Sequence, residues 1–169
     1  MWAGIFGDKI VGPLFIEGNI NGENYLNMLQ ESVDPLITEI VENEVDEQGI
    51  LFHDENLVHF QQDGAPPHYC GNVRRWLDEK FPNKWIGRRG PIEWPARSPD
   101  LTPLDFFLWG HLKSVVYKTQ PVDVNELRNR IIEECRAIPR EVFRNVRAEF
   151  ENRLYYCLQK NGEHFEHLM

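Results

Sequence analysis

The chain has 169 residues, a net charge of −9 at neutral pH and 41% hydrophobic residues, including five Trp and ten Phe. This composition predicts one domain with a sizeable core, or one domain with a helical tail. No apolar run of about 18 residues and no basic segment before an apolar one are present, so neither a membrane span nor a signal peptide is predicted. Three cysteines without a Cys-x-x-Cys pair argue against a zinc finger or a disulfide framework and fit a reducing compartment.

The net charge is divided unevenly along the chain. Residues 1–56 carry 12 acidic residues and Lys9 as their only basic residue, a net charge of −11, so the remainder sums to +2. Residues 64–97 alone carry a net charge of +4. A basic segment of this kind could meet a polyanion such as DNA, or it could be a solvated helix face and loop.

The chain begins with a predicted β-hairpin. Residues 2–6 and 9–15 are short apolar runs rich in Ile, Val and Phe. Gly7 and Asp8 lie between them, and this dipeptide is typical of a hairpin turn. The sequence therefore predicts two antiparallel strands within its first 16 residues.

An amphipathic helix is predicted to follow from about Gly22. Its apolar residues recur at helical spacing and would share one face, namely Tyr25, Leu29, Val33, Leu36, Ile37 and Ile40. Pro35 is expected to end or kink this helix, or to begin a second one. Residues 42–55 are rich in acidic side chains, and we expect an exposed, mobile linker there.

The rest of the chain alternates predicted strands and helices. A strand over residues 56–63 is expected to end at Asp63, and a helix over 68–81 comes after a Gly-Ala-Pro-Pro turn. The other predicted elements are one or two strands over 84–95, a helix over 102–117, and two helices over about 123–137 and 139–160. This order predicts an α/β sheet covered by helices. In open sheets of this class, chemistry gathers at the carboxyl ends of the strands.

Three acidic residues lie where they could either cap helices or hold a cation. Asp63 ends a predicted strand, Asp100 lies in the turn SPDLTP, and Asp105 lies in the first turn of the next helix. Forming a turn or capping a helix is an ordinary role for such acids, and for Asp100 this is the favoured interpretation. Two carboxylates on rigid elements would suit Mg²⁺ or Mn²⁺, which prefer oxygen ligands and promote attack on phosphodiesters.

Basic and aromatic residues near these acids are candidate contacts to nucleic acid. His68 could touch a phosphate or water near Asp63, or it could pack at the start of a helix. Arg88, Arg89 and Arg97 are the candidate phosphate contacts. Three tryptophans could either stack on an unpaired base or fill the core, namely Trp85, Trp94 and Trp109.

Two motifs carry a resemblance to a known family. The segments FQQDGAPPH and WPARSPDLTPLDFFLW resemble the catalytic domain of the mariner-superfamily DDE/D transposases, and WAGI and GNING..Y fit its earlier part. The resemblance covers nearly the whole chain. It implies a ribonuclease H-like fold, cut-and-paste DNA transposition and catalysis with Mg²⁺ or Mn²⁺. It also implies DNA as the partner, a location in the nucleus and a homodimer of the full-length protein.

The resemblance assigns roles to individual acids. Asp63 matches the second catalytic acid of the family and Asp105 matches the third, and both would bind metal. Asp100 then belongs to the signature turn. The two matched acids are separated by 41 residues, more than in the best-known relatives, and the surplus fits the segment PNKWIGRRGP.

The family's first catalytic Asp lies on a strand before the one that opens with WAGI, and we expect this chain to start after it. Asp8 is no substitute, because it lies in the hairpin turn. We therefore expect a partial ribonuclease H-like mixed sheet flanked by helices over residues 1–120, and a helical extension over 121–169 packed on it. Without one metal ligand, the chain alone should cleave DNA weakly or not at all. The alternatives are a non-catalytic transposon-derived remnant, a recruited DNA- or protein-binding module, and a cellular ribonuclease H.

Overall fold

The fold is described from a computed structural model that covers three stretches of the chain, residues 1–43, 58–95 and 98–169. These residues pack as two compact units. We call Ile16–Arg97 the central unit, and Met1–Phe15 together with Ser98–Met169 the split unit. The linker expected over 42–55 falls mostly outside the described residues, and the predicted division at residue 120 stays a prediction.

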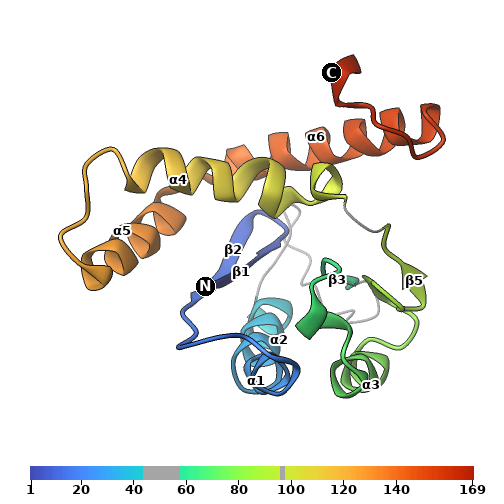
Figure 1. Ribbon diagram of the computed structural model, residues 1–169, viewed down its shortest axis with the longest axis horizontal. Coiled ribbons are helices and arrows are strands. Elements are labelled where there is room, and N and C mark those ends of the chain that lie inside the picture. Colours follow the sequence, from blue (N-terminus) through green and yellow to red (C-terminus); the bar gives the residue numbers. More distant parts are fainter. Residues whose placement is uncertain (44–57, 96–97) are drawn as a thin grey trace. The chain divides into compact units, whose positions relative to one another are not determined.

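The predicted hairpin is confirmed and belongs to the split unit. Strands β1 (Trp2–Phe6) and β2 (Lys9–Leu14) pair antiparallel as a two-stranded sheet (Figure 1). Gly7 has a φ of 58° in the turn, a conformation that strains a residue with a β-carbon. Ala3 and Val11 are buried, so one face of the hairpin is packed.

The rest of the split unit is helical. Its elements are η4 (Pro99–Leu101), η5 (Leu104–Trp109), α4 (Gly110–Val116), α5 (Val124–Ala137), α6 (Arg140–Gln159) and η6 (Glu166–Leu168). The predicted helix over 102–117 is present as a π-helical turn, η5, that continues into α4. The two predicted C-terminal helices are confirmed as α5 and α6. No helix in the described stretches is long and apolar enough to cross a bilayer.

The core of the split unit joins the hairpin to these helices. Ala3 of β1 packs with Leu108 of η5, Leu112 of α4 and Cys135 of α5. Leu108 is 0% exposed, so the helix that carries the signature motif is anchored by burial. Burial also raises the pKa of the Cys135 thiol to about 11, which keeps it a neutral core group.

The central unit contains helices around a short sheet. Its elements are α1 (Gly22–Met28), η1 (Leu29–Val33), α2 (Asp34–Asn43), β3 (Phe60–Gln61), η3 (Pro66–Tyr69), α3 (Gly71–Lys80), β4 (Trp85–Gly87) and β5 (Ile92–Glu93). Helix α1 packs against α3 and η3. An ion pair of 2.8 Å between Asp34 and Lys80 links α2 to α3.

The predicted helix from Gly22 has three parts. The Asn21 side chain accepts hydrogen bonds from the amides of Glu23 and Asn24, both at 2.9 Å, and so caps α1. The π-helical η1 joins α1 to α2. Pro35 is the second residue of α2, where the π-helical η1 passes directly into α2, so the helix changes geometry there and does not end. The predicted apolar face is buried at Tyr25, Leu29, Val33 and Ile37.

The sheet of the central unit is parallel, in the order β3-β4-β5. The described strands therefore form two small sheets, one in each unit. Trp85 of β4 is 1% exposed and its Nε1 donates to Asp78 of α3 at 2.8 Å, so it fills the core and is not placed to stack on a base. Gly90 permits this packing, because a β-carbon there would lie 2.7 Å from the Trp85 ring.

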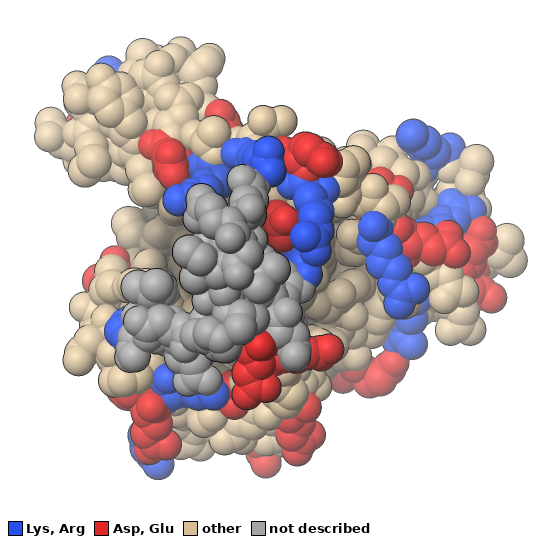
Figure 2. All heavy atoms as spheres, turned by 180° about the vertical axis from the view of Figure 1, so that it is seen from behind, with Lys and Arg blue, Asp and Glu red and all other residues tan. Residues whose placement is uncertain are grey.

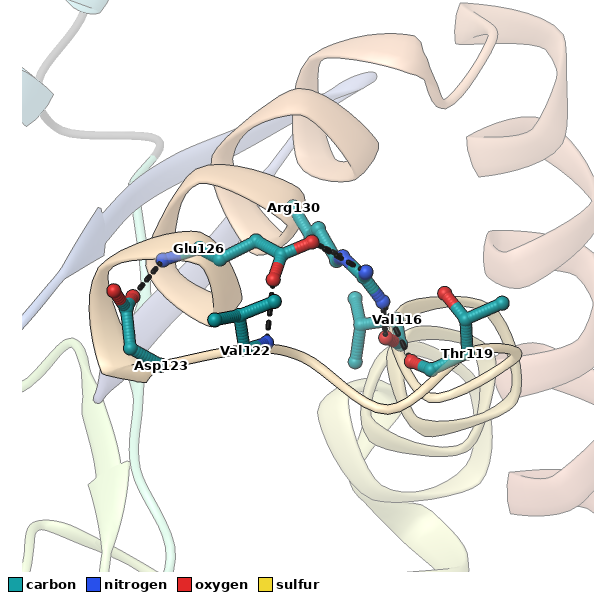
Figure 3. Close-up of polar contacts among 6 residues, drawn as sticks. All are labelled: Val116, Thr119, Val122, Asp123, Glu126 and Arg130. Atoms are coloured by element: carbon teal, nitrogen blue, oxygen red, sulfur yellow. Dashed lines mark hydrogen bonds and ion pairs between the residues drawn. The ribbon is translucent and has the colours of Figure 1, made fainter.

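Arg130 of α5 fastens the loop between α4 and α5 (Figure 3). Its Nη1 donates to the carbonyls of Val116 and Thr119 at 2.9 and 2.6 Å, where α4 ends. Its Nε and Nη2 donate to Oε1 of Glu126 at 3.1 and 2.5 Å, and Oε2 of Glu126 accepts from the Val122 amide at 2.5 Å. The Val122 amide first, and then the guanidinium, lower the pKa of Glu126. One side chain thus satisfies the end of α4 and fixes the loop after it.

Replacing Arg130 by Met is expected to lower the free energy of unfolding by about 1–3 kcal/mol, because two carbonyls lose charged donors. Urea denaturation of the whole chain measures this change. Arg136→Met is the matched control, since Arg136 is an exposed arginine of the same helix, and its effect should stay within about 0.5 kcal/mol. Equal losses in the two variants would contradict a special role for Arg130.

Candidate functional site

Asp63 lies in the central unit, immediately after the last sheet bond of β3. The Gln62 amide donates to the Ile86 carbonyl at 2.9 Å, and the chain then leaves the sheet. The Asp63 side chain is 51% exposed, and its Oδ1 accepts a hydrogen bond from the Ala65 amide at 2.9 Å. Asp63 therefore shapes the turn, in agreement with one of its two predicted roles, and also presents a carboxylate at the carboxyl end of a strand.

His68 of η3 holds the Asp63 carboxylate. Its Nδ1 lies 2.5 Å from Oδ1 of Asp63. The hydrogen-bonding imidazole lowers the pKa of Asp63, burial opposes this effect, and the Ala65 amide adds to the lowering. The net direction is downward, so the carboxylate is ionised at neutral pH.

Two arginines lie against one tyrosine beside this loop. The guanidinium carbon of Arg88 lies 4.4 Å from the centre of the Tyr69 ring, and that of Arg89 lies 5.5 Å from it. Glu93 accepts a hydrogen bond from the Arg89 amide at 2.9 Å, which supports the backbone there. Sequence reasoning named both arginines and missed Tyr69, whose only signal was an aromatic residue in a basic segment.

Arg88 also lies close to the loop that carries Asp63. A β-carbon at Gly64 would lie 3.6 Å from Cδ of Arg88, so the Arg88 stem passes beside the residue next to Asp63. Within the described part of the chain, neither Arg88 nor Arg89 pairs with a carboxylate side chain. Arg97, the third arginine predicted to contact phosphate, lies outside the described residues.

Charge on the surface is mixed. Figure 2 shows Lys and Arg side chains interspersed with Asp and Glu over the described atoms of one face. The case for an anion site depends on the local arrangement of two arginines around Tyr69, and not on net charge.

Asp105 belongs to the split unit and lies in the first turn of η5. It is exposed, and its amide donates to the Thr102 carbonyl at 2.8 Å. No side chain caps η5, so the structure does not give Asp100 the capping role that was favoured for it. Asp100 instead takes part in the turn through its backbone carbonyl, which accepts a hydrogen bond from Arg153 at 3.0 Å.

Arg153 of α6 supports the segment that carries Asp105. Its guanidinium carbon lies 4.5 Å from the centre of the Phe106 ring, next to Asp105 in the chain. The side chain is 13% exposed and also pairs with Glu149 at 3.0 Å and Glu166 at 3.4 Å. Sequence reasoning missed this residue, because a single arginine on a long amphipathic helix gives no sign of a distant partner.

Of the five predicted site residues that the structure describes, four lie in the central unit and one lies in the split unit. Asp63, His68, Arg88 and Arg89 surround one loop of the central unit, whereas Asp105 is part of the split unit. Among the residues that the structure describes, no group of three or more His, Cys, Asp or Glu side chains could hold a metal ion. The predicted metal site therefore stays a prediction.

Comparison with known proteins gives relatives by sequence. The chain is 26% identical to the Tc3 transposase of Caenorhabditis elegans over 165 residues, which are 96% of this chain and 44% of that protein. It is 25% identical to the Tcb1 transposase of Caenorhabditis briggsae over 103 residues, 61% of this chain and 35% of that protein. No protein-family model matches the chain.

Comparison with solved structures gives the fold. Two structures of the Mos1 transposase catalytic domain with raltegravir, one with Mn and one with Mg, match with TM-scores of 0.76 and 0.74. Each is 19% identical in sequence and covers 97% of this chain, and the match spans 76% and 75% of the solved chains. The chain is similar in sequence to the Tc3 and Tcb1 transposases and in fold to the Mos1 catalytic domain. The resemblance seen in its two motifs is confirmed, and so is the ribonuclease H-like α/β fold class.

The sequence match covers only part of each full-length relative. The chain spans less than half the length of the curated relatives that it matches. In fold, it matches the Mos1 transposase catalytic domain over 97% of its own length. The expected absence of the first catalytic Asp and the expected homodimer stay predictions.

Replacing His68 by Ala is expected to raise the pKa of Asp63 toward its ordinary value, since the imidazole is the largest cause of the lowering. The lowered pKa stabilises the fold above the pKa of the unfolded chain, and this contribution is lost as the pH falls through the folded-state value. The variant should therefore lose less stability than the wild type between about pH 5 and about pH 2. A carbon-13 NMR titration of the carboxyl groups measures the pKa directly.

His164→Ala is the control for this titration, because His164 is exposed and belongs to the split unit. The pKa of Asp63 should be the same in this variant as in the wild type. Identical titration of Asp63 in the His68→Ala variant would show that the imidazole does not govern the charge of the carboxylate.

Proposed function

We propose that this chain is the catalytic part of a mariner-type DNA transposase, which cuts and joins DNA phosphodiesters in the nucleus. The observation that carries the proposal is the loop after β3. There an ionised Asp63 lies beside two arginines that have no carboxylate partner within the described residues. An acid for metal binding next to cations for phosphate is the combination that phosphodiester chemistry needs. Similarity to the Tc3 transposase over 96% of the chain supports the same function.

Asp63 and Asp105 are the proposed metal-binding acids. Their donor chemistry fits Mg²⁺ or Mn²⁺, since both are carboxylates on exposed positions and Asp63 is ionised at neutral pH. The Mos1 catalytic domain has been solved with each of these metals, which supports the choice. When bound, such an ion would promote attack by a water or a 3′-hydroxyl and stabilise the leaving oxygen.

Arg88 and Arg89 are the proposed contacts to DNA phosphates. Stacking on Tyr69 orients both guanidiniums before DNA arrives, so less side-chain freedom is lost on binding. His68 remains a predicted DNA contact through Nε2, because Nδ1 is already paired with Asp63. Arg97 remains a predicted phosphate contact, and it lies outside the described residues.

Replacing both Arg88 and Arg89 by Gln is expected to weaken DNA binding and to lower its dependence on salt. Each phosphate contact contributes about 0.9 to the slope of log affinity against log salt, so the slope should fall by about two. Fluorescence anisotropy of a labelled DNA duplex, titrated at several salt concentrations, measures both quantities. The sequence of the duplex should matter little for this effect, since phosphate contacts carry no base information.

The charge-matched control replaces Arg136 and Arg147 by Gln, two exposed arginines on α5 and α6. Its slope should stay close to that of the wild type. An equal fall in both double variants would mean that only net charge matters, and the site would be wrong. A chain that fails to bind DNA at any salt concentration would overturn the proposal and favour a non-catalytic remnant or a protein-binding module.

A further inference from the structure

The imidazole that holds Asp63 is itself held by a buried tyrosine. The ring of Tyr25, in α1, stacks on the ring of His68 with 4.3 Å between centroids and 28° between planes. Tyr25 is 1% exposed, so this ring lies in the core of the central unit. Stacking of this kind fixes the plane of the imidazole and therefore the direction of its Nδ1.

A buried glutamine connects the same tyrosine to the backbone of His68. The hydroxyl of Tyr25 donates to Oε1 of Gln62 at 2.9 Å, and Nε2 of Gln62 donates to the carbonyl of His68 at 2.8 Å. Gln62 is 6% exposed, and its own amide donates to the Ile86 carbonyl in β4 at 2.9 Å. Helix α1, strand β4 and turn η3 are thus tied together through one residue.

We propose that Tyr25 and Gln62 are positioning residues, which act through His68 to hold Oδ1 of Asp63 and leave Oδ2 to bind a divalent cation. This inference depends on the proposed function, because only that function gives the Asp63 carboxylate a divalent cation to bind. Oδ1 of Asp63 accepts from the Ala65 amide and lies 2.5 Å from Nδ1 of His68, whereas Oδ2 has no hydrogen bond within the described residues.

Burial gives this arrangement its rigidity. Hydrogen bonds between buried neutral groups are costly to leave unmade, so Tyr25 and Gln62 keep each other in one rotamer. An exposed Asp without such support would sample several rotamers and would lose that freedom on binding a cation. Side chains that orient a metal ligand in this way commonly change metal affinity by about 10- to 100-fold when they are replaced.

The test uses Mn²⁺ as the probe and the whole 169-residue chain. Binding near Asp63 broadens the backbone amide NMR signals of Gly64 and Ala65, and Asp63→Asn shows how much of the broadening depends on the carboxylate. Tyr25→Phe removes only the hydroxyl and keeps the ring on His68, whereas Gln62→Leu removes both links. The Mn²⁺ concentration for half-broadening should rise about tenfold in Gln62→Leu and by a smaller factor in Tyr25→Phe.

Two further variants separate positioning from general stability. Gln61→Leu is the matched control, because Gln61 is the last residue of β3, directly before Gln62, and has no side-chain hydrogen bond within the described residues. Its Mn²⁺ affinity should match the wild type. His68→Leu should lose affinity as Gln62→Leu does, and His68→Gln should restore part of it through an amide donor. Tyr25→Phe keeps the inference testable if Gln62→Leu does not fold.

Two outcomes would overturn the inference, and they differ from failure of the proposed function. If the wild type binds Mn²⁺ at Asp63 and both Tyr25→Phe and Gln62→Leu bind it equally well, the positioning role is wrong. If Asp63→Asn does not change the broadening, the metal-binding part of the proposed function fails. In that case the chemical shifts of the Asp63 carboxyl carbon and of Nδ1 of His68 decide, and unchanged shifts in Tyr25→Phe and Gln62→Leu would overturn the positioning role as well.

Discussion

The contact between His68 and Asp63 fixes where the central unit presents its negative charge. A carboxylate that is half exposed keeps most of its hydration, so it avoids the large cost of burying an ion. Its partner is anchored from the other side by neutral groups that are almost fully buried. The central unit therefore keeps the charged carboxylate in contact with water and places its rigid support in the buried core.

The split unit also supports an exposed acid by buried residues, but with different side chains. Asp105 lies at the exposed start of η5, while Leu108, three residues later, is completely buried. Arg153 holds the neighbouring Phe106 and the carbonyl of Asp100 from α6. An acid at the surface is again supported by packing behind it, here through an aromatic ring and a long helix. The helical C-terminal part of the chain thus takes part in shaping the signature motif.

Local patterns in the sequence predicted much of this fold. Short apolar runs around Gly7 indicated the hairpin, and helical spacing from Tyr25 indicated the buried face of α1, η1 and α2. The relation to transposases was visible in two motifs whose residues are contiguous, so they could be recognised without a structure. The same contiguity explains why Asp63 and Asp105 could be placed at a strand end and at a helix start from the sequence.

Contacts between distant residues could not be predicted in the same way. Tyr25 and Gln62 are 37 positions apart. In the sequence alone, Tyr25 is an ordinary core aromatic residue and Gln62 an ordinary glutamine next to a strand. The role of Trp85 depends on Gly90, because only the absence of a β-carbon lets the ring pack there. The π-helical turns η1 and η5 also have no distinct spacing of apolar residues, since tertiary packing decides where a helix widens.

The order of the two units along the chain constrains how the protein can fold during synthesis. The central unit is continuous in sequence and can fold once residue 97 has left the ribosome. The hairpin is made before the central unit, whereas its core partners Leu108, Leu112 and Cys135 are made after it. Strands β1 and β2 are therefore translated before the helices that cover their apolar face in the core. An isolated two-stranded hairpin is only marginally stable.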